Sequence, residues 1–387
     1  MKVSPRGAAI AVVGLAFFTD TVLYYLLVPL LPGYAKSFGL GPMGVAVLFG
    51  SYAVALLACT FPLGRLADRV GRRKPMLWGL VGLGATTILF AFSTSFPLLV
   101  LARVLQGVSA AATWVSGLAL LADHFPAGER GRAMGTAFAC SNVGILLGPP
   151  ASGWLAEHAG PRSPFVLAAL LALLDALARA FLLVDVPMET GRRLGARDLL
   201  KNRDVRIYAG AMALGSGMWA LLESTMPVDL DRRLALTPTA IGLLFAAAAA
   251  SHAVTSPLMG SLSDRIGRPR VVTAGLLLAL VLLPFPALLG NLRAIVAVML
   301  LLGITTSLVL SPASPALADA VEQMGSQSYG SVFSILNVAY AAGMMVGPFL
   351  GGVLISLVGL KGALVVLAAG FGAYAPVVWR ARPASHP

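Results

Sequence analysis

Charged residues are scarce in this chain of 387 residues. They make up 11% of it, whereas hydrophobic residues make up 58% and the mean hydropathy is +0.86. Soluble globular domains carry roughly a quarter charged residues, so this composition excludes an ordinary water-soluble protein. Long apolar runs with few charges are typical of helices that cross a lipid bilayer. The composition therefore predicts a polytopic membrane protein.

Cysteine and histidine are almost absent as well. The two cysteines, Cys59 and Cys140, lie inside apolar runs, and the four histidines are scattered along the chain. Neither residue type has the spacing of a metal site or a disulfide framework, and no nucleophile and base pair stands out. We therefore expect no metal, no cofactor and no enzyme. The sequence also lacks an N-x-S/T acceptor for glycosylation, which fits a prokaryotic plasma membrane.

Twelve apolar runs, each about as long as a bilayer-spanning helix, follow one another along the chain. They cover residues 8–31, 44–63, 75–93, 97–122, 132–156, 164–186, 207–228, 238–260, 271–290, 292–317, 329–355 and 361–379. No stretch alternates with the two-residue period of a membrane β-strand. We predict an all-α membrane protein of twelve transmembrane helices, in which a cytoplasmic linker at 187–206 separates six-helix halves at 1–186 and 207–387.

Lysine and arginine are distributed unevenly between the two sides of the predicted spans. One side carries most of them, including the clusters at 65–74, 192–206 and 265–270. Because cytoplasmic loops carry the excess of Lys and Arg, we expect both termini in the cytoplasm. The net charge of +12 reflects this topology, and since the basic residues lie in short loops we expect no nucleic-acid partner.

The two halves repeat each other. GRLADRVGRRK (64–74) follows the second run, and GSLSDRIGRPR (260–270) follows the eighth, 196 positions later. Likewise GILLGPPASG (144–153) in the fifth run returns as GMMVGPFLGG (343–352) in the eleventh. Duplicated six-helix units are the layout of transporters that rock two halves around a site near the bilayer midplane. The residues expected to let these helices pack closely and bend are Gly144, Gly148, Pro149, Gly343, Gly347 and Pro348.

The motif residues in the repeated loops also carry charge. Asp68 and its arginines are expected to form a cluster between helix ends that holds one conformation and is released in the other. The alternative for the arginines is simple positive-inside topology. The gating loops are predicted at Gly64, Asp68, Arg69, Arg72, Asp264 and Arg265.

These motifs resemble those of a known family. GxxxDRxGRR is similar to the signature of the major facilitator superfamily and occurs here in both halves, and LARVLQG (101–107) resembles its proton-coupling motif. The stretch 146–181 resembles drug:proton antiporters close to the vesicular amine transporters. Residues that match the antiporter motif of the fifth span are Gly135, Gly144, Gly148, Pro149 and Gly153. The resemblance implies a fold of two pseudo-symmetric halves and proton-coupled antiport.

Asp20 stands in the middle of the first span, in FFTDTVLYYLLVPLLP (17–32). An unpaired carboxylate at the bilayer centre costs several kcal/mol, so we expect it to face the bundle interior or an aqueous cavity. We interpret Asp20 as a proton carrier, and the alternative is a hydrogen-bonded structural acid. Tyr24, one helical turn later, is expected to line the substrate cavity.

Other intramembrane charges need partners too. Arg103 and Glu223 both lie about 8–9 Å below the outer boundary, in spans four and seven, and are expected to pair as an outer gate. Arg103 has a second interpretation, in which it acts on Asp20 and drives proton release. Asp175 and Arg179 are spaced i, i+4 in span six, which favours a structural pair.

The remaining predicted cavity residues are aromatic or amide side chains within spans. For the tryptophans the alternative is packing or interface anchoring, and for the asparagines it is interhelical hydrogen bonding. The amine-transporter relatives carry a lysine where Tyr52 stands and acids where Leu310 and Asn337 align, so the resemblance implies a simpler exchanger without their second site. The cavity residues are Trp114, Phe138, Asn142, Trp219, Asn337 and Tyr340.

The sequence thus predicts a proton-coupled antiporter that exports small amphiphilic, cationic organic compounds by alternating access. The alternative is a facilitator or symporter of the same fold for a neutral or anionic metabolite, such as a sugar or an organic acid. We expect a plasma-membrane monomer whose partners are a small-molecule substrate, protons and the lipid bilayer.

The orientation can be tested by labelling. Cysteines introduced at Gly191 and Gly267 in a background without Cys59 and Cys140 should be shielded from an impermeant thiol reagent in whole cells, because both positions are expected on the cytoplasmic side. The same cysteines should react in permeabilised cells, which serves as the control. Ready labelling from outside would overturn the predicted topology.

Overall fold

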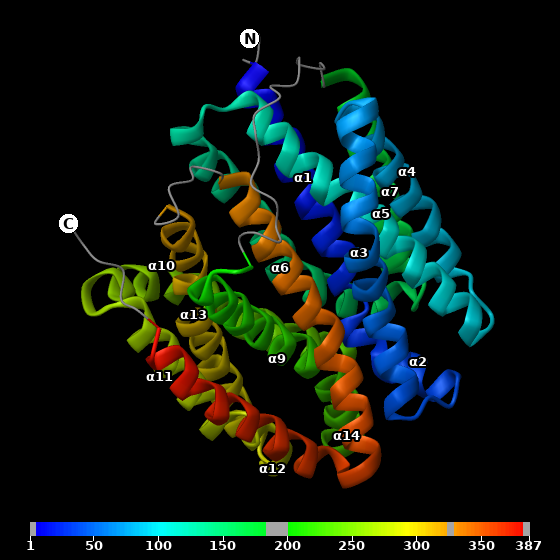
Figure 1. The fold of residues 1–387 in the computed structure, drawn as a ribbon. Helices are drawn as coiled ribbons and strands as arrows, with labels where there is room; N and C mark the ends of the chain where they lie inside the picture. Colours follow the sequence, from blue (N-terminus) through cyan, green and yellow to red (C-terminus); the bar gives the residue numbers. More distant parts are fainter. Residues whose placement is uncertain (1–4, 183–199, 323–328, 382–387) are drawn as a thin grey trace. The chain divides into compact units, whose positions relative to one another are not determined.

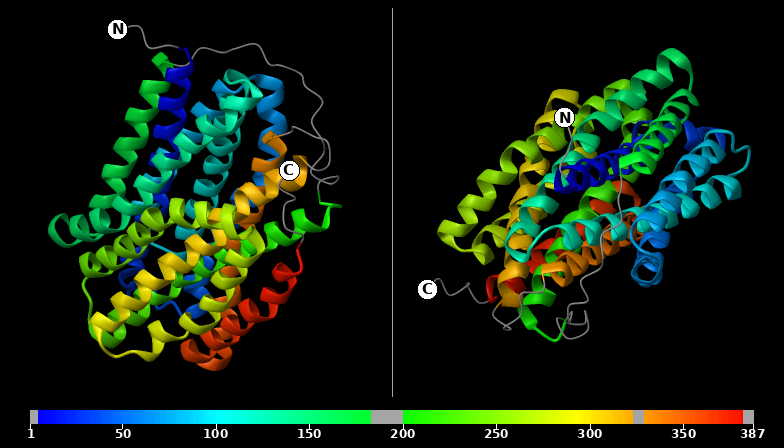
Figure 2. Two further views of the ribbon diagram at one scale, coloured as in Figure 1. Left: turned by 90° about the vertical axis from the view of Figure 1, so that its left-hand side faces the viewer. Right: turned by 90° about the horizontal axis from the view of Figure 1, so that it is seen from above.

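The structure is a computed structural model in which residues 5–182, 200–322 and 329–381 are described, and these residues are helical with short connections (Figures 1 and 2). No strand occurs in those ranges, so the predicted all-α architecture is confirmed. The helices of the first part are α1 (Pro5–Tyr25), η1 (Val28–Leu30), α2 (Leu31–Ser37), α3 (Pro42–Val70), α4 (Arg73–Ala91), α5 (Phe96–His124), α6 (Ala127–Ala159) and α7 (Ser163–Leu182). Those of the second part are α9 (Arg203–Leu234), α10 (Pro238–Ile266), α11 (Arg268–Leu282), α12 (Phe285–Leu288), α13 (Leu292–Glu322) and α14 (Tyr329–Trp379).

Nine helical segments among the described residues are long and apolar enough to cross a membrane, and Ser163–Leu177 is a shorter apolar helix. The twelve predicted spans map onto these segments with two differences. Helix α14 covers two predicted spans and is interrupted at Gly359, whose φ of +71° is not helical. Helix α6 contains many glycine, proline and polar residues and is not among the nine.

Two predicted spans are broken by proline. The run at 8–31 divides into α1, the 3₁₀ turn η1 that contains Pro29, and α2. The run at 271–290 ends as α11 at Leu282, and α12 follows after Pro284. Because proline lacks a backbone N–H and disfavours helical geometry in the residue before it, each run is divided into consecutive helical segments. Each still forms one candidate membrane span, Arg6–Ser37 and Arg268–Leu288.

Large apolar side chains are exposed along the helices. Trp78 is 58% exposed, Val254 71% and Leu357 75%, and many leucines and valines resemble them. Exposed apolar surface of this extent marks contact with another apolar phase rather than with water. The surface therefore agrees with a chain that lies in lipid.

The chain divides into two compact units. Unit 1 comprises Met1–Tyr34, Ser51–Arg192 and Pro238–Gly242, and unit 2 comprises Ala35–Gly50, Arg193–Thr237 and Leu243–Pro387. In unit 1, α1 packs on α6 and α4 packs on α5; in unit 2, α9 packs on α14 and α11 on α13. The predicted halves stay a prediction: the units differ from them at 35–50 and at 238–242.

The repeated glycine motif holds helices together at short range within each unit. Gly144 and Gly148 of α6 lie against α1, where an added Cβ would come within 2.9 and 3.2 Å of its atoms. Gly343 and Gly347 of α14 lie closer still to α9, where an added Cβ would collide with the backbone carbonyls of Ala213 and Gly217. Small residues permit such approaches between helix backbones. The helices continue through Pro149 and its counterpart in α14, so bending at these prolines stays a prediction.

A single methyl group tests this packing. An added Cβ on Gly107 of α5 would collide with the backbone carbonyl of Tyr52 on α3, whereas one on Gly370 would meet no described atom within 4 Å. We expect Gly107→Ala to destabilise the solubilised protein by about 1–3 kcal/mol, because the helices must separate. Gly370→Ala is the control, and thermal unfolding in detergent is the measurement. Equal stability of the two variants would contradict the packing.

Candidate functional site

Asp20 lies on α1, is 2% exposed, and receives two hydrogen bonds from neutral side chains of unit 1. The hydroxyl of Tyr52 on α3 donates to Oδ2 at 2.9 Å, and Nε1 of Trp114 on α5 donates to the same oxygen at 2.7 Å. The other oxygen, Oδ1, is buried and has no hydrogen-bond partner among the described residues. Three helices thus meet at one buried carboxylate.

Aromatic rings flank this carboxylate. Trp114 stacks on Phe17 with ring centroids 3.9 Å apart, and Phe138 of α6 lies 5.9 Å from both rings. The sequence predicted Trp114 as cavity wall or packing, but missed its hydrogen bond to Asp20. Asn142, one turn after Phe138, is exposed. The aromatic cluster of Phe17, Trp114 and Phe138 can contact an apolar or cationic group beside Asp20.

Arg103 on α5 is buried next to Tyr52. Its guanidinium carbon lies 5.4 Å from the ring centre of Tyr24 and 4.9 Å from that of Tyr52. Nη1 donates to Oε1 of Gln106 at 3.1 Å, and Nε2 of Gln106 donates to Thr87 on α4. Cation–π contacts of this kind stabilise a guanidinium away from water. Arg103 and Asp20 are therefore linked through one shared tyrosine.

Unit 2 holds the other predicted cavity residues. Glu223 of α9 is 1% exposed, and Trp219, one turn earlier, packs against Phe245 of α10 with ring centroids 6.3 Å apart. Tyr340 and Asn337 lie on α14 and are half-buried, and the backbone carbonyl of Tyr340 accepts a hydrogen bond from α9. The predicted pairing of Glu223 with the arginine of span four joins different units and stays a prediction.

Asp175 and Arg179 of α7 form the pair that their spacing predicts. Arg179 Nε donates to Oδ1 of Asp175 at 3.0 Å and Nη2 donates to Oδ2 at 2.6 Å, and both side chains are fully buried. Such two-pronged pairs fix geometry as well as compensating charge. Helix α7 packs on α1 and α4, so the pair lies inside unit 1.

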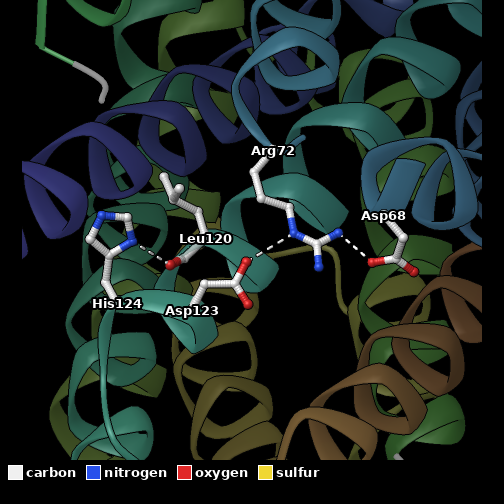
Figure 3. A network of polar contacts seen from close by, with 5 residues as sticks. All are labelled: Asp68, Arg72, Leu120, Asp123 and His124. Carbon is white, nitrogen blue, oxygen red and sulfur yellow. Dashed lines mark hydrogen bonds and ion pairs between the residues drawn. The ribbon is translucent and has the colours of Figure 1, made fainter. Parts of the chain in front are cut away.

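The DRxGR motif of unit 1 forms a charge cluster with a residue that the sequence reasoning missed (Figure 3). Arg72 donates from Nη1 to Asp68 at 2.5 Å and from Nε to Asp123, at the end of α5, at 3.1 Å. His124 beside it bonds the carbonyl of Leu120 at 2.9 Å. One arginine thus joins the ends of two helices.

Unit 2 repeats this cluster. Arg268 contacts Asp264 at 3.7 Å and also pairs with Asp319 of α13. The three residues lie 196 positions after Arg72, Asp68 and Asp123, respectively. This equal offset is the signal by which Asp123 and Asp319 could have been found.

The prediction that the motif residues occupy loops is wrong. Helix α3 continues to Val70 and α10 to Ile266, so Gly64, Asp68, Arg69, Asp264 and Arg265 are helical. The turns themselves are short, and Gly71 and Gly267 adopt a positive φ of 88° and 95° there. Glycine suits this conformation because it has no Cβ. Arg69 and Arg265 are exposed, whereas Arg72 is buried in its cluster.

The described residues include no group of three or more His, Cys, Asp or Glu side chains that could hold a metal ion. The fold and the paired motifs define instead a multi-pass membrane protein of repeated helix units. The family model of the Major Facilitator Superfamily matches residues 13–228 and 207–387. The chain belongs to this superfamily of membrane transporters, and the predicted family resemblance is confirmed.

The chain is also similar to curated transporters. It is 32% identical over 345 residues to the chromaffin granule amine transporter of Homo sapiens, covering 87% of this chain and 65% of that protein. It is 29% identical over 329 residues to the synaptic vesicular amine transporter of Mus musculus, covering 84% and 63%. The alignments thus span slightly less than two thirds of these relatives.

Solved structures share the fold. A bacterial homologue of the human lysosomal transporter Spinster, in an inward-facing and unoccupied conformation, matches with a TM-score of 0.83 at 16% identity, over 98% of this chain and 97% of the other. The human organic anion transporter MFSD10 matches with a TM-score of 0.71 at 22% identity, over 97% and 100%. At these identities the likeness shows the fold alone.

The buried pair on α7 yields a stability prediction. Arg179→Met leaves the carboxylate of Asp175 buried and uncompensated, so we expect a loss of about 3–5 kcal/mol. The double change Asp175→Leu with Arg179→Met should recover most of it. As a matched control, Arg6→Met breaks an exposed pair with Glu129, in which both side chains are 56% exposed, and should cost less than about 1 kcal/mol. Thermal unfolding in detergent measures the stability of the three variants. Equal losses of stability in Arg179→Met and Arg6→Met would contradict the prediction.

Proposed function

We propose that this chain is a proton-coupled antiporter that exports small amphiphilic, cationic organic compounds across the plasma membrane by alternating access. Membership in the Major Facilitator Superfamily and similarity to proteins named amine transporters support transport of an amine or drug-like compound. The observation that best supports proton coupling is the buried carboxylate of Asp20, which accepts hydrogen bonds from the described residues at only one of its two oxygens.

A buried carboxylate with aromatic neighbours is suited to exchange a proton for a cationic substrate. Burial in an apolar bundle makes the negative charge costly, so a cation at Asp20 is strongly favoured. A proton and a cationic substrate can both neutralise it, but they compete for the same charge. Phe17, Trp114 and Phe138 supply apolar surface and π-faces next to Asp20 for the rest of an amphiphilic substrate.

The two DRxGR clusters fit a conformational latch. Arg72 and Arg268 each tie the end of one helix to the end of another through two carboxylates. Ion pairs between helix ends can break and re-form when helices shift, and so favour one of two arrangements. Because the clusters recur at the same spacing in both units, we assign them the same role.

A facilitator or symporter for a neutral or anionic metabolite is the second candidate. The buried guanidinium of Arg103 is the observation that favours it, because a carboxylate substrate would find a fixed cation there. Arg103 already contacts two tyrosine rings and Gln106, so a substrate would have to displace these contacts. The cationic exchanger therefore remains the main proposal.

Inverted vesicles separate these functions. With an imposed pH gradient, wild-type protein should take up lipophilic amine cations and dissipate the gradient, whereas sugars and organic acids should not. Asp20→Asn should abolish gradient-driven uptake, because the amide takes up no proton. Glu129→Gln, an acid-to-amide change at an exposed position, is the control and should retain uptake. Undiminished amine:proton exchange by Asp20→Asn would reject the assignment.

A further inference from the structure

Tyr52 touches two charged groups at once. Its hydroxyl donates a hydrogen bond of 2.9 Å to Oδ2 of Asp20, and the guanidinium carbon of Arg103 lies 4.9 Å from the centre of its ring. The three side chains are at most 3% exposed and come from α3, α1 and α5 of unit 1. Tyr52 is therefore the physical link between the carboxylate and the guanidinium.

The two oxygens of Asp20 are not equivalent. Oδ2 receives hydrogen bonds from both Tyr52 and Trp114, which use its two acceptor sites. Oδ1 is buried and accepts no hydrogen bond from the described residues. A proton bound at Oδ1 would leave both hydrogen bonds at Oδ2 in place, whereas a proton at Oδ2 would have to displace a donor.

We propose that Tyr52 is a positioning residue for the proton carrier: together with Trp114 it holds Oδ2 of Asp20, so that the transported proton binds at Oδ1. This inference rests on the proposed function, in which Asp20 carries the proton. A proton taken from water forms the O–H bond at Oδ1 and yields a neutral carboxylic acid. Its return to water restores the carboxylate with both donors still in place.

Protonation also changes what Tyr52 does for Arg103. A hydrogen bond to a carboxylate is roughly twice as strong as one to a neutral acceptor, so protonation of Asp20 loosens the Tyr52 hydroxyl. The ring of the same residue makes a cation–π contact with the guanidinium of Arg103. The hydrogen bond stays in place but is weaker, so the position of the ring, and with it the contact to Arg103, depends on the protonation state of Asp20.

The charged and titratable neighbours stay unchanged when only the hydroxyl is removed. Helix α4, which also contacts α1, has its only charged residues, Arg73 and Lys74, at its beginning. A shift in pH dependence after Tyr52→Phe therefore reports the lost hydrogen bond. The groups facing this part of α1 are Tyr24 on α1 itself, Arg103 on α5, Cys140 on α6, and Asp175 with Arg179 on α7.

The first measurement is the pH profile of gradient-driven amine uptake. Tyr52→Phe keeps the ring beneath Arg103 but removes a donor that stabilises the charged carboxylate, so the midpoint should move to higher pH by about 1–2 pH units. Trp114→Phe should shift it in the same direction. Tyr374→Phe is the matched control: its hydroxyl donates to the carbonyl of Ile207 in unit 2, and its loss should leave the midpoint unchanged.

A second measurement does not depend on transport. In a protein whose other tryptophans are replaced by phenylalanine, Trp114 is the only indole and lies 2.7 Å from Asp20. Its fluorescence should titrate with the carboxylate, and Tyr52→Phe should move this midpoint as it moves the uptake profile. Asp20→Asn should abolish the titration. The positions replaced are Trp78, Trp154, Trp219 and Trp379.

The outcomes separate this inference from the proposed function. Midpoints in Tyr52→Phe that equal the wild-type values overturn the inference, and so does a matching shift in Tyr374→Phe. If Tyr52→Phe does not fold, an unshifted uptake profile in Trp114→Phe overturns it. If wild-type protein moves amines without protons, the proposed function fails, and the fluorescence titration still decides whether Tyr52 holds Asp20.

Discussion

A charge buried between apolar helices must be compensated, and this constraint governs the described interior of the protein. Asp175 meets it with a guanidinium on its own helix, and Arg72 meets it with carboxylates from two helix ends. Asp20 is different, because its hydrogen bonds come from the neutral groups of Tyr52 and Trp114. Neutral donors stabilise a carboxylate without cancelling its charge, so a mobile cation can complete the compensation.

The internal repeat preserves the arginine–carboxylate clusters at the helix ends but not the two donors that surround Asp20. The clusters around Arg72 and Arg268 recur with the same three residue types at the same spacing. The residues 196 positions after Tyr52 and Trp114 are Ala248 and Leu310, and neither has a side chain that can donate a hydrogen bond. The helix-end clusters are therefore common to both units, whereas the two donors to Asp20 have no counterpart at the equivalent positions of unit 2.

Local patterns in the sequence predicted much of this arrangement. Hydropathy identified Asp20 as an exception within an apolar run, and i, i+4 spacing identified the Asp175–Arg179 pair. The structure adds what depends on how distant helices cross. Tyr52 and Trp114 lie 32 and 94 positions from Asp20, and no periodicity links them.

The positions at which helices end were also predicted poorly from the sequence. An apolar run reports the thickness of the hydrocarbon layer rather than the length of the helix. Helix α3 continues past its predicted end at residue 63 to Val70, and α10 likewise continues to Ile266. These extra turns place Asp68 and Asp264 on rigid helices, within reach of Arg72 and Arg268 one turn later. A charge cluster on helix ends moves with its helix, which a flexible loop would not ensure.

A tyrosine at position 52 has electrostatic consequences for Asp20 and for the exchange proposed there. A lysine at this position, which the resemblance noted in the sequence implies for the amine transporters, would place a second cation beside Arg103 and Asp20. A phenol donates the same kind of hydrogen bond without adding charge, and its ring accommodates the guanidinium. Arg103 is held by the rings of Tyr24 and Tyr52 and by Gln106, so the hydrogen bonds at the carboxylate of Asp20 still come from neutral groups. A second fixed cation beside the carboxylate would repel a proton or an organic cation, so the neutral phenol favours the exchange proposed above, in which one mobile cation replaces another at Asp20.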